Sequence, residues 1–191
     1  MGKVQATLPV KLFVGVLTSI PELLPEIEKE LTELLGAVDV RSELFPFDMT
    51  NYYDKEMGSP IYRWFLGFVN LIEAPAVADA KIVTNELESS MAEKYPGVRR
   101  PVNLDPGYLE QSKIVLASTK NFFHRILIAR NIYAEVTLHY QDRQWKSFPW
   151  TFPDYSSETY HPFFTALREN YRRQLNAAGF EIRIPQKPHR H

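Results

Sequence analysis

Hydrophobic residues along the chain follow first a strand-like and then a helix-like spacing. Residues 11–17 form a compact apolar run, which predicts a buried strand. Apolar residues then recur at helical spacing over 23–35, and Gly36 is a typical helix stop. Residues 38–47 return to a strand-like pattern. The first part of the chain therefore predicts a β-α-β unit.

The next part of the chain predicts two more strands and another helix. Residues 48–60 are rich in turn-forming types and predict a loop. A long strand over 61–72, a helix over 74–94 and a short strand over 99–104 follow. Asp105-Pro106-Gly107 is a strong turn sequence, so we expect the short strand to end there. The resulting β-α-β-β-α-β order is that of the ferredoxin-like fold.

The pattern after residue 110 predicts a β meander. Strands are expected over 113–119, 124–129 and 132–140, the last two joined by the tight turn Arg130-Asn131. A final helix is expected over 158–178. We therefore predict an α+β fold, with a ferredoxin-like βαββαβ core extended by an antiparallel β meander and a C-terminal helix.

Composition agrees with one globular domain. A chain of 191 residues, 45% hydrophobic and 24% charged, suits a single domain, which we expect over 1–184. Residues 185–191 are expected to form a flexible C-terminal tail. The formal net charge is −1, which disfavours nucleic acid as a partner, because phosphate binding normally requires a strong positive excess.

Several classes of chemistry are excluded by what the chain lacks. It contains no cysteine, so disulfides, thiolate nucleophiles and cysteine-ligated metals are ruled out. The P-loop, the dinucleotide-binding glycine pattern, the zinc-protease motif and the nucleophile elbow are absent. Residues 1–10 have no apolar signal-peptide core, and the longest apolar runs are too short to cross a bilayer. We expect a cytoplasmic protein that does not associate with membranes.

Asn103 and Asp105 form the first candidate site. Alternation along the strand puts both side chains on the same side, at a strand end where binding sites are common. An amide and a carboxylate there can hold a ligand hydroxyl or a divalent cation. The alternative is that Asp105 only starts a turn.

The hairpin on either side of Arg130-Asn131 carries the second candidate site. A two-residue turn places Ile128 opposite Tyr133 and puts His124 and Glu135 on the same face, while Leu127 faces the core. A histidine beside a carboxylate can act as a general base or bind a metal. The alternative is an ordinary solvated sheet face.

The third candidate site is a set of cations near predicted strand or helix ends: Lys120, with His124 and Arg125 close by, and Arg63, Lys81, Arg99 and Arg100. Four of them, Arg63, Lys81, Lys120 and Arg125, are expected to hold an anion. Converging lysines and arginines recognise phosphate or carboxylate groups. The hairpin register places Arg125 at the edge of the core face, which makes it the least secure of the four. The alternative is that all of them are scattered surface charges.

Two aromatic segments complete the candidates. The loop over 47–58 contains Tyr53 and Glu56 and can be either a lid or a packed connection. The stretch from Trp150 to Tyr155 can stack on a ligand ring or, as the simpler interpretation, cover the core.

The chain resembles a bacterial and archaeal family known as domain of unknown function 4416, over about residues 9–173. The matching segments are PFDMTNYYDKEMG (46–58), KIVTNELE (81–88), RPVNLDPGYL (100–109), KIVLASTKNFFHRILI (113–128), IYAEVTLHY (132–140) and PWTFPDY (149–155). Members are often labelled GTP-binding proteins, for which this chain has no P-loop. The resemblance implies a set of signature polar residues: Tyr52, Tyr53, Glu56, Arg63, Lys81, Asn85, Glu88, Asn103, Asp105, Lys120, His124, Arg125, Tyr133, Glu135 and Asp154.

The leading hypothesis is a small-molecule enzyme or ligand-binding protein for an anionic ligand, such as a nucleotide or phosphorylated metabolite. The expected catalytic residues are His124, Glu135 and Lys120, and Asp105 with Glu135 are the candidate ligands of a divalent cation. The expected ligand-binding residues are Arg63, Lys81, Asn85, Asn103, Asp105, Arg125, Tyr133, Tyr53 and Glu56. The alternatives are an RNA-binding module and a protein-interaction scaffold, in its simplest form a homodimer.

Overall fold

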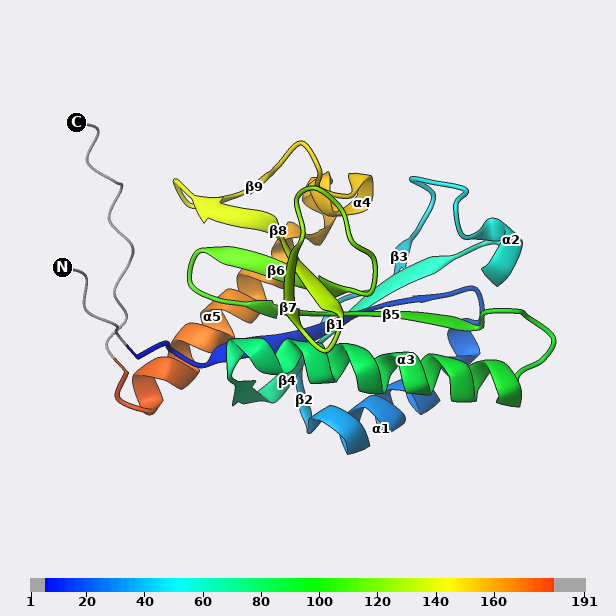
Figure 1. The fold of residues 1–191 in the computed structure, drawn as a ribbon, viewed down its shortest axis with the longest axis horizontal. Coiled ribbons are helices and arrows are strands. Elements are labelled where there is room, and N and C mark those ends of the chain that lie inside the picture. Colours follow the sequence, from blue (N-terminus) through cyan, green and yellow to red (C-terminus); the bar gives the residue numbers. More distant parts are fainter. Residues whose placement is uncertain (1–5, 181–191) are drawn as a thin grey trace.

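A computed structural model describes residues 6–180 as one large antiparallel sheet with helices on both faces (Figure 1). The expected tail over 185–191 lies outside the described residues. The strands are β1 (Val10–Thr18), β2 (Val38–Arg41), β3 (Phe45–Pro46), β4 (Tyr62–Ile72), β5 (Val102–Leu109), β6 (Lys113–Ser118), β7 (Ile126–Ala129), β8 (Ile132–Gln141) and β9 (Gln144–Ser147). The helices are α1 (Leu24–Leu35), α2 (Asp54–Met57), α3 (Val77–Lys94), α4 (Pro153–Ser156) and α5 (His161–Ala177), with short 3-10 turns η1 (Pro21–Leu23), η2 (Ala74–Ala76) and η3 (Glu158–Tyr160).

The first half of the sheet has the arrangement expected of a βαββαβ core. The strand order is β2-β4-β1-β5-β6-β8-β7, so β1 and β4 are central in the core and β2 and β5 flank them. The predicted α+β fold, with its antiparallel extension and C-terminal helix, is confirmed. The strand expected over 38–47 is divided into β2 and β3, because residues 42–44 leave the strand conformation.

Side chains of β1 alternate between two cores on opposite faces of the sheet. Leu12, Val14 and Val16 pack in a core with residues of α1 and α3. Phe13 points the other way, into an aromatic core completed by α5, where it packs against Phe164. Both faces of the central strands are therefore covered by helices.

The expected turn at Asp105-Pro106-Gly107 is wrong, because these residues continue β5. Asp105 pairs with Gly15 and Pro106 with Val14 of β1, so tertiary pairing overrides the local turn preference. The next strand, β6, pairs with β5 only from Gly107 to Leu109. Before Gly107 the two strands separate.

Pro106 explains the separation of β5 and β6. The Glu110 amide donates to the Lys113 carbonyl, so the backbone groups of residue 110 face β6. Backbone groups of a strand point to the same neighbour at every second residue, so those of residues 108 and 106 face β6 as well. Proline has no N–H to donate at that position, and the ladder ends. The edge left open at Leu104 is closed by α3 instead. Glu88 accepts from the Leu104 amide at 2.8 Å, and the Lys81 ammonium donates to its carbonyl at 2.7 Å.

The hairpin between β7 and β8 has the predicted turn but not the predicted register. Arg130 and Asn131 both have positive φ values, 49° and 62°, as a tight two-residue turn requires. A bulge after Leu127 moves that residue opposite Tyr133, the place expected for Ile128. Leu127 is consequently 56% exposed rather than part of the core. The strand also begins at residue 126, so His124 and Arg125 lie in the preceding loop.

We predict that Gly107→Ala lowers the free energy of unfolding by about 2 kcal/mol through overpacking. A Cβ at Gly107 would lie 2.5 Å from the Val115 carbonyl oxygen and 2.8 Å from the Phe13 ring. Gly97→Ala is the matched control, because a Cβ there has nothing within 4 Å. Urea denaturation of both variants checks this, and equal stability of the two would contradict the close approach of β5 and β6.

Candidate functional site

A cleft opens where β5 and β6 separate. Its volume is 380 Å³. One wall comes from β5 and α3, the facing wall from β6, β8 and the loop over 119–125, and the third side from the loop over 47–53 and from α4. The break in the sheet at Pro106 therefore creates the space in which polar side chains from distant segments meet.

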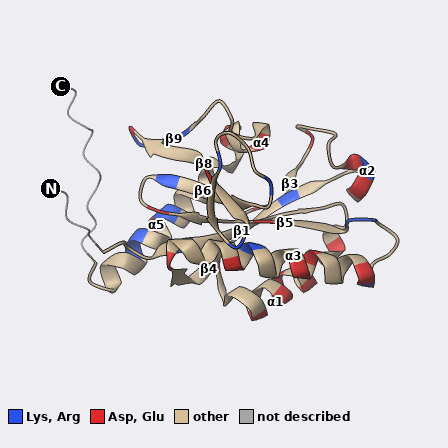
Figure 2. Ribbon diagram, viewed as in Figure 1, with Lys and Arg blue, Asp and Glu red and all other residues tan. Residues whose placement is uncertain are grey.

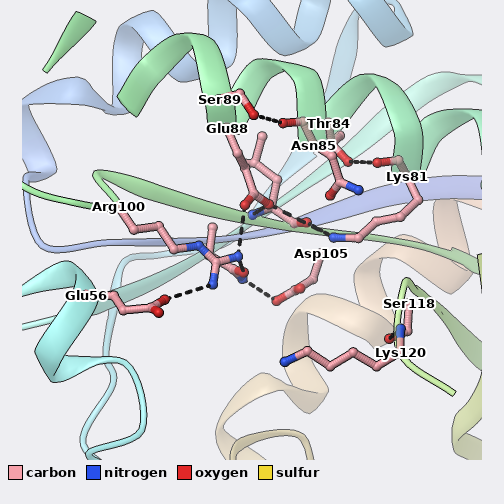
Figure 3. A network of polar contacts seen from close by, with 12 residues as sticks. Glu56, Lys81, Thr84, Asn85, Glu88, Ser89, Arg100, Asp105, Ser118 and Lys120 are labelled. Atoms are coloured by element: carbon pink, nitrogen blue, oxygen red, sulfur yellow. Dashed lines mark hydrogen bonds and ion pairs between the residues drawn. The ribbon is translucent and has the colours of Figure 1, made fainter. Parts of the chain in front are cut away.

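A chain of polar contacts follows the β5 wall (Figure 3). The Arg100 guanidinium lies 2.8 Å from Glu88 and also donates to the Asn103 side chain. Asn103 in turn donates to Asp105 at 2.8 Å. Burial raises the pKa of Glu88 even though the charges of Lys81 and Arg100 oppose this effect. Hydrogen bonds between alternating donors and acceptors thus hold the side chains of this wall, which come from α3, from Arg100 and from β5.

Arg63 lies at the bottom of the cleft between two carboxylates. Its guanidinium is 3.1 Å from Asp105 and 3.1 Å from Asp154, and the residue is only 3% exposed. The centres of the Phe47 and Tyr155 rings each lie within 6 Å of the guanidinium carbon. Arg63 therefore joins β4, β5 and α4 in one buried cluster.

The two carboxylates around Arg63 titrate in opposite directions. Burial alone would raise the pKa of Asp105, but the charges of Arg63 and Lys81 outweigh it and lower that pKa. Burial raises the pKa of Asp154, and the neighbouring charge of Asp105 adds to this against the effect of Arg63. Asp105 is therefore the group that stays ionised most readily, and Asp154 is the one that takes up a proton first.

Glu135 of β8 is the buried centre of the facing wall. Its carboxylate accepts from Arg125 Nε at 2.7 Å, contacts His124 Nε2 at 2.9 Å and accepts from the Thr137 hydroxyl at 3.2 Å. Arg125 also donates to the Ser118 hydroxyl, so it fastens the loop over 119–125 to the sheet. The expectation that Arg125 lies at the core face is wrong, because the loop turns its side chain toward Glu135.

His124 lies behind Glu135 rather than in the cleft. Its ring stacks on Trp150 with centroids 5.4 Å apart, and it is not among the residues that line the cavity. The predicted contact with Glu135 is present, but a proton can pass between His124 and a ligand only through that carboxylate.

Lys120 stands at the mouth of the cleft. Its ammonium lies 3.3 Å from the Tyr52 hydroxyl and 5.6 Å from the centre of the Tyr52 ring. Both residues are exposed. This contact links the loop over 119–125 to the loop over 47–53, so the two loops form the rim.

The structure brings most of the predicted site residues to this one cleft. Those that line it are Arg63, Lys81, Asn103, Asp105, Lys120, Arg125, Glu135 and Tyr53. Four lie outside it: His124 behind Glu135, Glu56 3.7 Å from Arg100, Asn85 on α3, and Tyr133 paired with Ser118 in the sheet. Their roles in binding or catalysis remain predictions.

Sequence reasoning selected Lys81 as a ligand-binding residue and named Glu88 and Asp154 through the family resemblance alone, but it did not select Tyr155. Asp154 and Tyr155 belong to an aromatic stretch interpreted mainly as cover for the core, yet both line the cleft. Lys81 and Glu88 share the inward face of α3 with its apolar residues, at a spacing of seven. Charged residues at the helical spacing of the buried apolar residues indicate that this face of α3 meets polar partners, which here are the backbone groups of β5.

The arrangement does not favour the expected divalent cation at Asp105 and Glu135. Within residues 6–180 there is no group of three or more histidine, aspartate or glutamate side chains arranged to hold a metal ion. Glu135 already accepts from Arg125, and Asp105 from Arg63 and Asn103. Each carboxylate is thus neutralised by an arginine of the protein itself.

Comparison with known proteins gives one match. The model of the family Domain of unknown function (DUF4416) matches residues 8–171, which span both walls of the cleft. No curated protein and no solved structure matches the chain. None of the helices in residues 6–180 combines the length and apolar character needed to cross a membrane.

We predict that Asp105→Asn lowers the free energy of unfolding by about 2 kcal/mol at pH 7, because Arg63 loses a charged hydrogen-bond partner. The pKa of Asp105 is lowered in the fold, so its ionised form stabilises the protein above the unfolded-state pKa of about 3.9. That contribution disappears as the pH falls through the lower folded-state value. Urea denaturation from pH 7 to pH 3 should therefore show the variant approaching the wild type in acid.

Asp79→Asn is the control for this pH series. Asp79 pairs with Arg130 on the surface, with both side chains about 60% exposed, so its loss should change stability by less than about 0.5 kcal/mol. A difference between Asp105→Asn and the wild type that stays constant down to pH 3 would contradict the ionised pair with Arg63.

Proposed function

Because the chain belongs to the family Domain of unknown function (DUF4416), whose description gives no activity, we propose a function from its cleft: the binding of a small anionic molecule, such as a nucleotide or another phosphorylated metabolite. The protein is then a ligand-binding protein or a small-molecule enzyme. The observation that carries the proposal is the charge of the cleft.

The cleft is positive although the chain as a whole is not. Five cationic side chains line it against three carboxylates, while the formal net charge of the chain is −1. Figure 2 shows acidic residues distributed along α1 and α3. A cleft lined by an excess of cations concentrates anions and steers them to one place.

The two rim cations, Lys120 and Arg125, keep binding capacity for a ligand. Lys120 is exposed, and its contact is a phenol hydroxyl at 3.3 Å rather than a carboxylate. In the described chain the hydrogen bonds of Arg125 run through Nε and Nη1, which leaves its Nη2 for a ligand. A lysine and an arginine on the same loop form a suitable pair for a phosphoryl or carboxyl group.

The size and the aromatic lining of the cleft suit a small metabolite. Ligand pockets typically span roughly 300–1,000 Å³, and 380 Å³ lies at the small end of that range. Tyr52 and Phe152 are exposed aromatic residues among those that line the cleft, where they can contact a ring or sugar. For a reaction in the cleft, Glu135 and Lys120 are the groups that reach the ligand, while His124 acts through Glu135 as a positioning residue.

The alternative of an RNA-binding sheet has less support. Base stacking on a ferredoxin-like domain uses an open sheet face with aromatic side chains. Here α1 and α3 cover one face of the central strands and α5 covers the other.

We predict that Lys120→Ala weakens anion binding about tenfold without changing the melting temperature of the free protein, because the side chain is exposed. The measurement is a thermal-shift screen with inorganic phosphate, pyrophosphate, AMP and GMP, followed by titration calorimetry of each anion that stabilises the protein. Lys29→Ala, on α1 with a side chain 70% exposed, removes the same charge elsewhere and should bind normally. Failure of every anion to stabilise the wild type, or equal binding by both variants, would overturn the proposal.

A homodimer is a second candidate role, favoured by an apolar strip at the end of the sheet. Phe122, Phe123, Ile126 and Leu127 are between 56% and 84% exposed. Strand β7 has a neighbour on one side only, so its outer edge is free to pair. Its residues 126–129 carry no charge, so two copies related by a twofold axis can pair β7 with β7 without repulsion.

We predict that the wild type is a dimer by light scattering coupled to size-exclusion chromatography and that Ile126→Lys is a monomer, because each copy would bury a lysine against the apolar strip of its partner. Leu34→Lys is the control, since Leu34 is 48% exposed on α1, away from β7. A monomeric wild type would contradict this role.

A further inference from the structure

The floor of the cleft is built from four side chains, two of which lie against Gly15. Arg63 comes from β4, Asp105 from β5, and Asp154 and Tyr155 from α4. A Cβ at Gly15 would lie 3.0 Å from Arg63 Nη1 and 3.0 Å from the Tyr155 hydroxyl oxygen. Both polar atoms therefore occupy the space that any other residue at position 15 would fill.

The charge of the floor differs from that of the rim. Asp105 and Asp154 share the single guanidinium of Arg63, so the four side chains of the floor include two carboxylates and one cation, with Lys81 as the next cation that acts on Asp105. An anionic group placed there would be repelled, whereas Lys120 and Arg125 attract it to the rim. The end of the ligand that reaches the floor is therefore neutral.

The Tyr155 hydroxyl indicates that the neutral end of the ligand carries a hydrogen-bond acceptor. Tyr155 is 1% exposed and lines the cleft, yet its hydroxyl oxygen has no hydrogen-bond partner within residues 6–180. Burial raises the pKa of Tyr155 well above its ordinary value, so the hydroxyl keeps its proton. A buried hydroxyl without a partner costs about 1–3 kcal/mol, which a ligand group bonded to it would recover.

We propose that this floor is a subsite for a hydroxyl group of the ligand, so that the ligand is a hydroxylated anion of the sugar-phosphate class. A ligand hydroxyl can accept from Tyr155 and at the same time donate to Asp105 or Asp154. An ammonium group can only donate, and an ionised phosphate can only accept, so neither satisfies both sides of the floor. The inference rests on the proposed anion binding and adds what the other end of the ligand carries.

The first test varies the ligand and uses only the wild-type protein. Titration calorimetry compares ribose 5-phosphate with n-pentyl phosphate, which has five carbons and the same phosphoryl group but no hydroxyl. We expect ribose 5-phosphate to bind about tenfold or more tightly, as a satisfied hydrogen-bonded pair in a buried site gives.

The second test removes the hydroxyl of the protein. Tyr155→Phe should weaken ribose 5-phosphate binding about tenfold, leave n-pentyl phosphate binding unchanged, and melt at the same or a higher temperature in the free state. Tyr171→Phe is the matched control, because the buried Tyr171 hydroxyl donates to the Pro9 carbonyl at 2.6 Å. That variant should melt at a lower temperature and bind both ligands normally.

The two proposals fail in different ways. Equal affinity of the wild type for the two phosphates, or no binding of ribose 5-phosphate, overturns the hydroxyl subsite even when Tyr155→Phe does not fold. Unchanged ribose 5-phosphate binding by a folded Tyr155→Phe, or a fall in its melting temperature as large as that of Tyr171→Phe, overturns it as well. The proposed anion binding fails on different results: no phosphate or nucleotide tested binds the wild type, or Lys120→Ala binds anions as well as Lys29→Ala does.

Discussion

The missing N–H of Pro106 is the constraint on which the cleft depends. A hydrogen-bonded ladder between β5 and β6 would close the sheet and leave no cavity, but Pro106 faces β6 and cannot extend it. An open strand edge inside a protein must find other partners. Lys81 and Glu88 supply them at Leu104, so two charged residues of α3 are drawn into the protein interior.

Each buried charge requires a partner of opposite charge, which explains why charged side chains gather along the walls of the cleft. Glu88 attracts Arg100, Arg100 orders Asn103, and Asn103 reaches Asp105, which shares Arg63 with Asp154. A hydrogen bond to a charged group contributes about 1.5–3 kcal/mol, so each contact is under strong structural constraint. Lys120 is outside this set, since it is exposed and paired with a phenol, and it is therefore the cation whose position is best explained by a ligand.

The sequence predicted the individual strands and helices better than it predicted strand ends and strand register. Apolar periodicity located the long strands and helices, because each of them buries one face. It did not predict the short elements α2, α4 and β9. Local turn preference misled at Asp105-Pro106-Gly107, since pairing with β1 outweighs it, and a bulge after Leu127 shifted the hairpin register. Most of the candidate residues still line one cleft. They could be selected from the sequence because charged and polar side chains are costly to bury and therefore tend to gather where they have partners. Tyr155 was not singled out, since a tyrosine that packs and a tyrosine that binds look alike in a sequence.

The cleft assigns an orientation to its ligand through the order of its charges. A phosphoryl group on the floor would face Asp105 and Asp154 at close range, in a site where little water screens the repulsion. A hydroxyl at the rim would leave the Lys120 ammonium facing a neutral group. A ligand bound in the reversed orientation would therefore have less favourable electrostatic interactions at both ends. The difference in binding free energy between the two orientations does not depend on any single hydrogen bond. An anion held by Lys120 and Arg125 would also join the two rim loops through Tyr52, so binding and closure of the rim would reinforce each other.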